Sequence, residues 1–99
     1  MSEWIYFIHP PRERFVASIT ADESAIMRTH RDHLARLFEQ DVLIMAGPTF
    51  GDVNTGVAVI EAEDEDAARA IMMSDPAVTS GLMTPELRPM RVTFLRGRA

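Results

Sequence analysis

The hydrophobic positions of this chain separate it into alternating strand-like and helix-like segments. Short runs of aromatic and β-branched residues are typical of strands, and longer segments with apolar residues every three to four positions are typical of helices. The pattern predicts strands at residues 4–9, 42–47, 56–62 and 85–95, and helices at residues 20–40, 63–74 and 76–81. Residues 12–19 show no clear period, and their structure stays open.

This order, β-α-β-β-α-β, predicts an α+β domain of the ferredoxin-like type. Because crossover connections are right-handed, the order gives a four-stranded antiparallel sheet with both helices on one face. The first strand is apolar on both sides, with Trp4, Tyr6 and Ile8 on one face and Ile5 and Phe7 on the other. Strands of this kind are usually covered on both sides. We therefore expect the face without helices to pack against a second copy, as a two-fold, sheet-to-sheet homodimer.

Polar residues mark the beginnings of the helices. Thr20 and Glu23 have the spacing of a capping box, in which each side chain satisfies a backbone amide of the other residue. Asp75 stands directly before Pro76, the arrangement expected for an N-cap followed by a proline in the first turn. Two of the three predicted helices thus begin at a recognisable signal.

The long helix carries two histidines in different positions. At about 100° per residue, its apolar side chains fill an arc of roughly 120° that also contains His30, whereas His33 falls just beyond the edge of the arc. The arc is formed by Ile26, Met27, Leu34, Leu37 and Phe38. A buried imidazole without a partner costs a few kcal/mol. We expect His30 to have a polar partner elsewhere in the chain and His33 to be half solvated or at a subunit contact.

Composition narrows the classes of function. The 99 residues form one predicted domain, and the net charge of −5 makes nucleic acid an unsuitable partner. There is no cysteine, which excludes disulfides, thiol nucleophiles and thiolate metal sites. No apolar run approaches the roughly 18 residues of a membrane span, and the first residues lack the basic region of a signal peptide. The expected setting is the cytoplasm, without membrane contact.

Several short motifs, taken in order, resemble those of the YCII-related family. They are His30 with Leu34, Ala46-Gly47-Pro48, Gly56 at the start of a strand, Glu63 with Ala67, Asp75-Pro76 with Gly81-Leu82, and Arg88-Pro89. The family is related to the dimeric α/β-barrel group, which includes muconolactone isomerase-like proteins and cofactor-free monooxygenases. One departure is Asp41, which stands where members usually have glycine; aspartate tolerates a left-handed helix cap nearly as well.

The resemblance implies a ferredoxin-like fold, a dimer and a site built on a histidine–aspartate pair. Carried over by position, the pair is His30 and Asp75, because the distance from His30 to Gly47-Pro48 fits without a gap. A carboxylate that accepts from one imidazole nitrogen raises the basicity of the other, which makes a general base near neutral pH. The leading hypothesis is cofactor-free proton transfer on a small organic molecule, of the lyase, isomerase or dehydrohalogenase type.

The same residues allow other interpretations. His30 and Asp75 are equally compatible with a structural pair in a non-catalytic module that binds a small ligand or a protein. His30, His33 and Asp75 could also hold a metal, but no further ligand is fixed by a motif, so we predict neither a metal nor a cofactor. Additional candidates for substrate contacts are Tyr6, His9, His33 and Arg91, the last as a guanidinium that binds a carboxylate.

Overall fold

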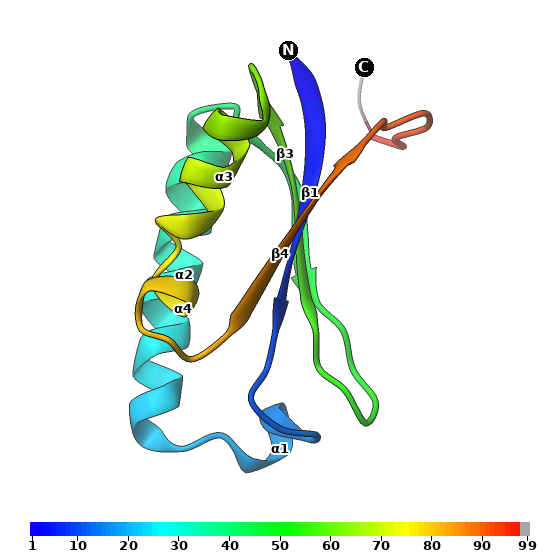
Figure 1. The fold of residues 1–99 in the computed structure, drawn as a ribbon. Coiled ribbons are helices and arrows are strands. Elements are labelled where there is room, and N and C mark those ends of the chain that lie inside the picture. Colours follow the sequence, from blue (N-terminus) through cyan, green and yellow to red (C-terminus); the bar gives the residue numbers. More distant parts are fainter. Residues whose placement is uncertain (98–99) are drawn as a thin grey trace.

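The computed structural model describes residues 1–97 and has the expected order of elements (Figure 1). Four strands form one antiparallel sheet in the order β2-β3-β1-β4. The strands are β1 (Ser2–His9), β2 (Leu43–Pro48), β3 (Gly56–Ala62) and β4 (Thr84–Met90). The helices are α1 (Phe15–Ser18), α2 (Ala21–Glu39), α3 (Glu65–Met73) and α4 (Pro76–Thr79). The predicted α+β class and β-α-β-β-α-β topology are confirmed.

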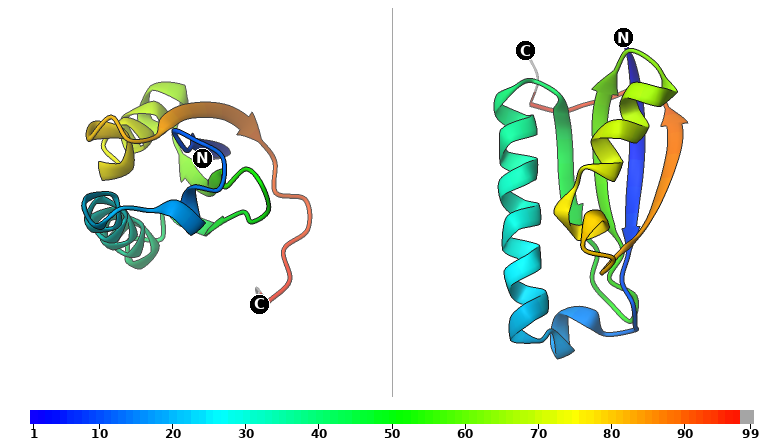
Figure 2. Two further views of the ribbon diagram at one scale, coloured as in Figure 1. Left: turned by 90° about the horizontal axis from the view of Figure 1, so that it is seen from below. Right: turned by 60° about the vertical axis from the view of Figure 1, so that its left-hand side comes forward.

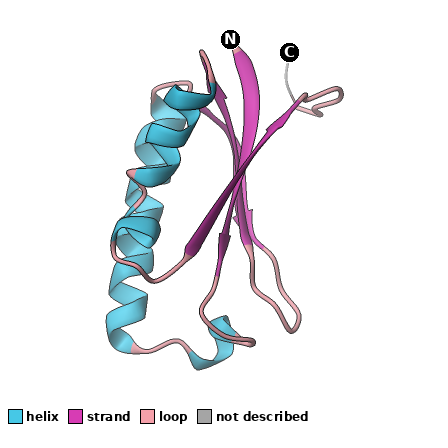
Figure 3. Cartoon of the chain, in the orientation of Figure 1, coloured by secondary structure: helices cyan, strands magenta, loops and turns pink. Residues whose placement is uncertain are grey.

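The helices α2, α3 and α4 lie together on one face of the sheet, and within residues 1–97 the opposite face carries no helix (Figures 2 and 3). The covered face of β1 and β3 supplies the centre of the core, including Tyr6, Ile8 and Ile60, each at most 3% exposed. Small and flexible side chains of the later helices, such as Ala68 and Met72, close the core from the other side. The alternation of faces along each strand thus decides which side chains meet the helices.

The local signals read from the sequence act as expected. The Thr20 side chain accepts from the Glu23 amide at 3.2 Å, and the Glu23 carboxylate accepts from the Thr20 amide at 2.9 Å, which completes the capping box. Arg12 binds the same carboxylate at 2.7 and 2.8 Å. These bonds lower the pKa of Glu23 to about 2, and the bond from Arg12 has the largest effect. After α2, Asp41 adopts a left-handed backbone with φ 60°, as its position at the end of the helix predicts.

The structure corrects the predicted end of the last strand and settles the structure of the segment before α2. β4 ends at Met90 rather than at residue 95, because Met90 pairs with Glu3 and the neighbouring strand begins at Ser2. Beyond that point the ladder has no partner, and the Val92 amide donates to the Glu3 carboxylate at 2.9 Å instead. The undecided segment before α2 contains one helical turn, α1, which buries Phe15.

Two side chains of α2 differ from the prediction made from its apolar arc. Phe38 was expected in the core but is 64% exposed, because it lies beside β2, the edge strand of the sheet, where no further strand covers it. His33 was expected to be half solvated or at a subunit contact, but it is buried within the single chain. Within residues 1–97, no helix has both the length and the apolar character needed to cross a membrane.

Candidate active site

Asp75 is a fully buried carboxylate at the junction of α3 and α4. It is the N-cap of α4, where its Oδ1 accepts from the Ala77 amide at 2.9 Å, and Pro76 occupies the first turn. Its side chain is 0% exposed. A buried carboxylate must have partners for its lone pairs. The backbone of α4 supplies one of them, and two side chains from distant parts of the chain supply the others.

The first side-chain partner is His30, which comes from the middle of α2. Its Nδ1 lies 2.7 Å from Oδ1 and 2.9 Å from Oδ2 of Asp75. An ionised carboxylate is only an acceptor, so Nδ1 carries the proton, and in the neutral form of the imidazole Nε2 has a free lone pair. The structure therefore brings together the two residues that the family resemblance pairs.

The second side-chain partner is Tyr6 on β1. Its hydroxyl donates to Asp75 Oδ2 at 2.7 Å, and its ring is 1% exposed. This hydroxyl was a candidate for binding a substrate oxygen, but in the structure it is bound to the carboxylate. Asp75 thus holds a histidine from α2 and a tyrosine from the sheet at a single point, which fixes the position of the helices relative to β1.

The surroundings change the pKa values of both acids. Burial alone raises the pKa of Asp75, but hydrogen bonds from His30, the charge of His30 and the hydrogen bond from Tyr6 outweigh it and hold this pKa below its usual value. Burial raises the pKa of the Tyr6 hydroxyl far above its usual value, and the adjacent Asp75 charge adds to the effect. Asp75 is therefore an anion and Tyr6 a neutral donor at neutral pH.

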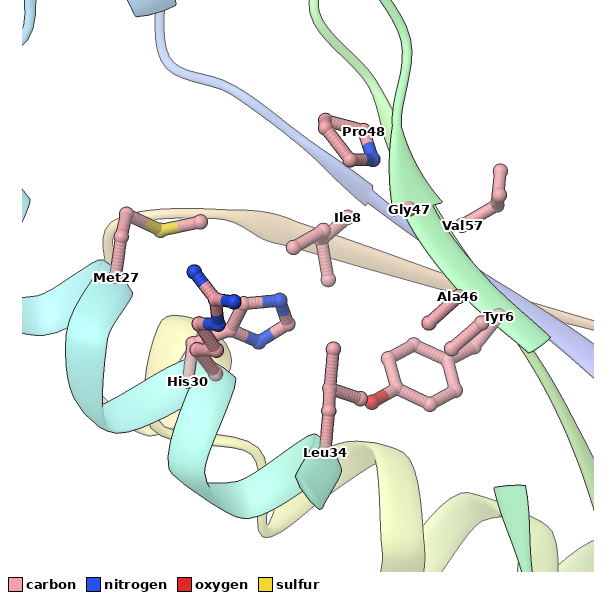
Figure 4. Close-up of a pocket in the computed structure, with 11 residues that line it drawn as sticks. Tyr6, Ile8, Met27, His30, Leu34, Ala46, Gly47, Pro48 and Val57 are labelled. Carbon is pink, nitrogen blue, oxygen red and sulfur yellow. The ribbon is translucent and has the colours of Figure 1, made fainter. Parts of the chain in front are cut away.

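A pocket of about 420 Å³ lies between α2 and the sheet, and His30 is part of its wall. Figure 4 shows His30 pointing into this space from α2, with Ile8 and Tyr6 on the opposite side. The volume falls in the range of roughly 300–1,000 Å³ typical of small-molecule sites. The lining residues are Tyr6, Ile8, Met27, His30, Arg31, Leu34, Ala46, Gly47, Pro48, Val57 and Ala58.

The free nitrogen of His30 is accessible. Its side chain is 13% exposed, and Nε2 has no hydrogen-bond partner in residues 1–97. The buried side-chain atoms without a partner in that range are Trp4 Nε1 and His33 Nε2, so His30 Nε2 is not one of the sealed atoms. One imidazole nitrogen is thus held by a buried anion while the other remains available to a ligand in the pocket.

The other candidates for substrate contacts do not line this pocket. His33 is buried outside the pocket wall, and burial lowers its pKa, although the charge of Asp75 opposes this shift. His9 binds Glu86 at 2.9 Å and Thr55 at 3.2 Å, next to Phe7. Arg91 lies in a smaller hollow with Met45 and residues 92–95. Of the four candidates, only Tyr6 belongs to the pocket wall.

The structure also bears on the metal hypothesis. In the described part of the chain, no three histidine or acidic side chains come together in an arrangement that could hold a metal ion. His30 Nδ1 is hydrogen-bonded to both carboxylate oxygens of Asp75. The arrangement is that of a hydrogen-bonded pair.

Comparison with known families identifies the domain. The model of the YCII-related domain matches residues 5–91, which include most of β1, the other three strands and the helices α1 to α4. The chain belongs to the YCII-related domain family. The resemblance based on its short motifs is thereby confirmed. No curated protein matches the sequence.

The fold of this YCII-related domain is similar to that of a solved structure of another protein. That protein is 5-chloro-2-hydroxyhydroquinone dehydrochlorinase (TftG) from Burkholderia phenoliruptrix AC1100, in complex with 2,5-dihydroxybenzoquinone. The TM-score is 0.57 and the sequence identity is 20%, over 88% of this chain and 93% of the dehydrochlorinase chain. At this identity the similarity establishes a common fold.

Two features of the site have little signal in the sequence. The face of β1 that carries Tyr6 was predicted to be apolar, and the need of a buried hydroxyl for a partner is the signal that could have pointed to Asp75. Arg31 lines the pocket although it lies outside the apolar arc of α2. No pattern marks it, because a long arginine side chain can reach a cavity from the edge of a helix face.

Proposed function

We propose that this YCII-related domain catalyses cofactor-free proton transfer on a small organic molecule bound in the pocket beside His30. The observation that carries the proposal is the asymmetry of this imidazole: Nδ1 is held by the buried Asp75, and Nε2 is available to the pocket. A residue held in this way has a fixed tautomer and a fixed ring orientation, as a general base requires.

In the proposed reaction, His30 Nε2 takes a proton from a carbon or hydroxyl group next to a carbonyl or a phenol. The electron pair left behind forms an enolate or a new double bond, and in an elimination the leaving group departs with its own bonding electrons. The imidazolium that forms is stabilised by the Asp75 carboxylate, which remains ionised. His30 then returns the proton to another position or releases it to solvent, which gives isomerase or lyase chemistry respectively.

Asp75 acts in this proposal as a positioning residue. It contacts His30, Tyr6 and the α4 backbone and does not line the pocket. The dehydrochlorinase with the same fold was solved with a small quinone, which supports a small cyclic molecule as the ligand here. The apolar lining by residues such as Ile8, Met27 and Leu34 suits the body of such a molecule.

The test is deuterium incorporation into small carbonyl and phenolic compounds in heavy water, followed by proton NMR. His30→Asn should slow the exchange at least about a hundred-fold, the scale of general acid–base catalysis. His9→Asn is a matched control, because His9 also pairs with a carboxylate, Glu86, at 2.9 Å but lies outside the pocket. Equal rates in wild type and His30→Asn would contradict the proposal. Binding without any exchange would instead support the non-catalytic module.

We further propose that the helix-free face of the sheet forms the homodimer interface. Apolar side chains on this side are exposed in the single chain, among them Met45, Met90 and Phe94, the last at 95%. Residues 91–95 lie beside Met45 and Val59 and extend this surface. Such patches on a small domain are typical of interaction sites.

The dimer is tested by sedimentation or light scattering across a concentration series. Met45→Glu should shift the protein to the monomer, because it places a charge in the proposed interface. Met73→Glu is the matched control: Met73 on α3 is 49% exposed, against 48% for Met45, but lies on the helical side. A wild-type protein that sediments as a monomer at all concentrations, or equal behaviour of both variants, would contradict the dimer.

A further inference from the structure

We propose that Arg31 makes the pocket selective for small organic anions, by binding a carboxylate, phenolate or enolate oxygen of the ligand at its guanidinium. The body of the ligand then lies against the apolar wall, within reach of His30. This inference rests on the proposed function in one respect, since it concerns the same pocket. It adds the chemical class of the ligand and the residue that recognises it.

The first argument is the scarcity of polar groups in the pocket. Among its eleven lining residues, three have side chains with polar atoms: Tyr6, His30 and Arg31. The hydroxyl of Tyr6 donates to Asp75, and Nδ1 of His30 is bound to the same carboxylate. The side-chain groups left for a ligand are therefore His30 Nε2 and the guanidinium. A ligand that satisfies both has an apolar body, a proton for His30 and an acceptor for Arg31.

The second argument is that the charge of Arg31 has no internal partner. In residues 1–97, Arg12, Arg14, Arg69 and Arg88 each form an ion pair with a carboxylate. Arg31 takes part in no ion pair and no side-chain hydrogen bond within the same range, although the chain carries 15 acidic residues. Its guanidinium, which is suited to two parallel bonds with a carboxylate, is thus available to a ligand.

The third argument is the position of Arg31 at the mouth of the pocket. Arg31 is exposed, whereas Ile8 and Ala58 in the same pocket are at most 3% exposed. Arg31, Leu34 and Ala46 also border a shallow groove between α2 and β2, so Arg31 stands between the pocket and the surface. An anion held there keeps part of its hydration, which avoids the large cost of burying an ion completely.

The charge of Arg31 also fits the charge distribution of the site. Asp75 is a buried anion behind His30, and it would repel an anionic ligand in the pocket. A cation at the mouth offsets this repulsion. When His30 removes a proton, negative charge grows on the ligand, and a nearby guanidinium stabilises that charge more than it stabilises the starting state.

The experiment compares two probes of equal size, 3-hydroxybenzoate and 3-hydroxybenzamide, by calorimetric titration. Only the first is an anion at neutral pH. Wild type should bind the acid at least about ten-fold more tightly than the amide, the scale of one charge-assisted hydrogen bond. Arg31→Gln should remove this preference while leaving the melting temperature near that of wild type, because the side chain is exposed and unpaired.

Arg28→Gln is the matched control. Arg28 is exposed on the same helix, and its replacement by glutamine removes the same charge. Its side chain makes one hydrogen bond, to Ser24 at 3.4 Å, and it does not line the pocket. It should keep the preference for the acid. Equal affinities of the two probes in wild type, equal losses in both variants, or no binding of the acid at millimolar concentration would each overturn the inference.

The outcomes also separate this inference from the proposed function. Binding of the probes requires no proton transfer, so a preference that follows Arg31 would stand even if His30→Asn left deuterium exchange unchanged. Conversely, exchange that depends on His30, with acid and amide bound alike, would support the function and reject the anion selectivity.

Discussion

Tyr6 and Asp75 are joined by a hydrogen bond of 2.7 Å although 69 positions separate them in the sequence. The bond links the central strand β1 to the beginning of α4, and the same carboxylate holds His30 of α2. One buried anion thus connects the sheet with two helices and orients the imidazole that faces the pocket. The stability of the domain and the geometry of the site depend on the same group.

Tyr6→Phe removes one of the partners of a fully buried carboxylate and keeps the aromatic ring. We expect it to lower the free energy of unfolding by about 1–3 kcal/mol, the usual cost of an unsatisfied buried group. The measurement is urea denaturation followed by circular dichroism. In an Asp75→Asn background the same substitution should cost less, because the charged acceptor is already absent. Equal costs in the two backgrounds would show that the negative charge of the acceptor adds nothing to this hydrogen bond.

Asp75 should make stability fall in acid. The folded state holds its pKa below the ordinary value of about 3.9, so its contribution is complete above that value and is lost as the pH falls toward the folded pKa. Urea denaturation of wild type from neutral pH downward should show this loss, and Asp75→Asn should reduce the slope below about pH 4. Asp32→Asn, at an exposed carboxylate on α2, should keep the wild-type slope. An unchanged slope in Asp75→Asn would contradict the assignment.

His33 should weaken the fold at mildly acidic pH. Burial lowers its pKa, so the unfolded chain takes up a proton at a higher pH than the folded one, and stability falls as the pH drops below about 6.5. Its Nε2 is also buried without a partner. His33→Leu should therefore raise the melting temperature by a few degrees at about pH 5.5 and by less at about pH 7.5. A gain that is the same at both values would show that protonation of His33 is not involved.

Gly56 allows β3 to pass close to Ile8, a residue of the pocket wall. A Cβ at this position would lie 2.8 Å from Ile8 Cγ1, so the isoleucine would have to move. Gly56→Ala should cost about 1–3 kcal/mol of stability, as overpacking does, and should weaken binding of 3-hydroxybenzoate.

Gly47→Ala is the control for this change. Gly47 also lines the pocket, but an added Cβ there would meet no atom within 4 Å. It should leave stability and binding close to those of wild type. Similar effects of the two substitutions on binding would show that the position of Ile8 does not determine the shape of the pocket.

Much of the fold could be predicted from the sequence because its signals are local. The capping box of Thr20 and Glu23, the N-cap at Asp75 and the left-handed turn at Asp41 each involve residues within one helical turn. The element order follows from apolar periodicity in the same way, and the placement of both helices on one face follows from right-handed crossover connections. The end of β4 was not predicted, because it depends on where the neighbouring strand β1 begins.

The sequence by itself determined the elements, their order and, through the family pattern, which histidine and aspartate to pair. Only the tertiary structure decided that Tyr6 completes the pair, that His33 is buried and that Arg31 stands at the pocket mouth. The physical reason is that these contacts depend on the sheet register and on the packing of α4 against α2, across 45 to 69 positions. Periodicity within a segment fixes the face on which a side chain lies, whereas its partner is fixed by how distant segments pack together.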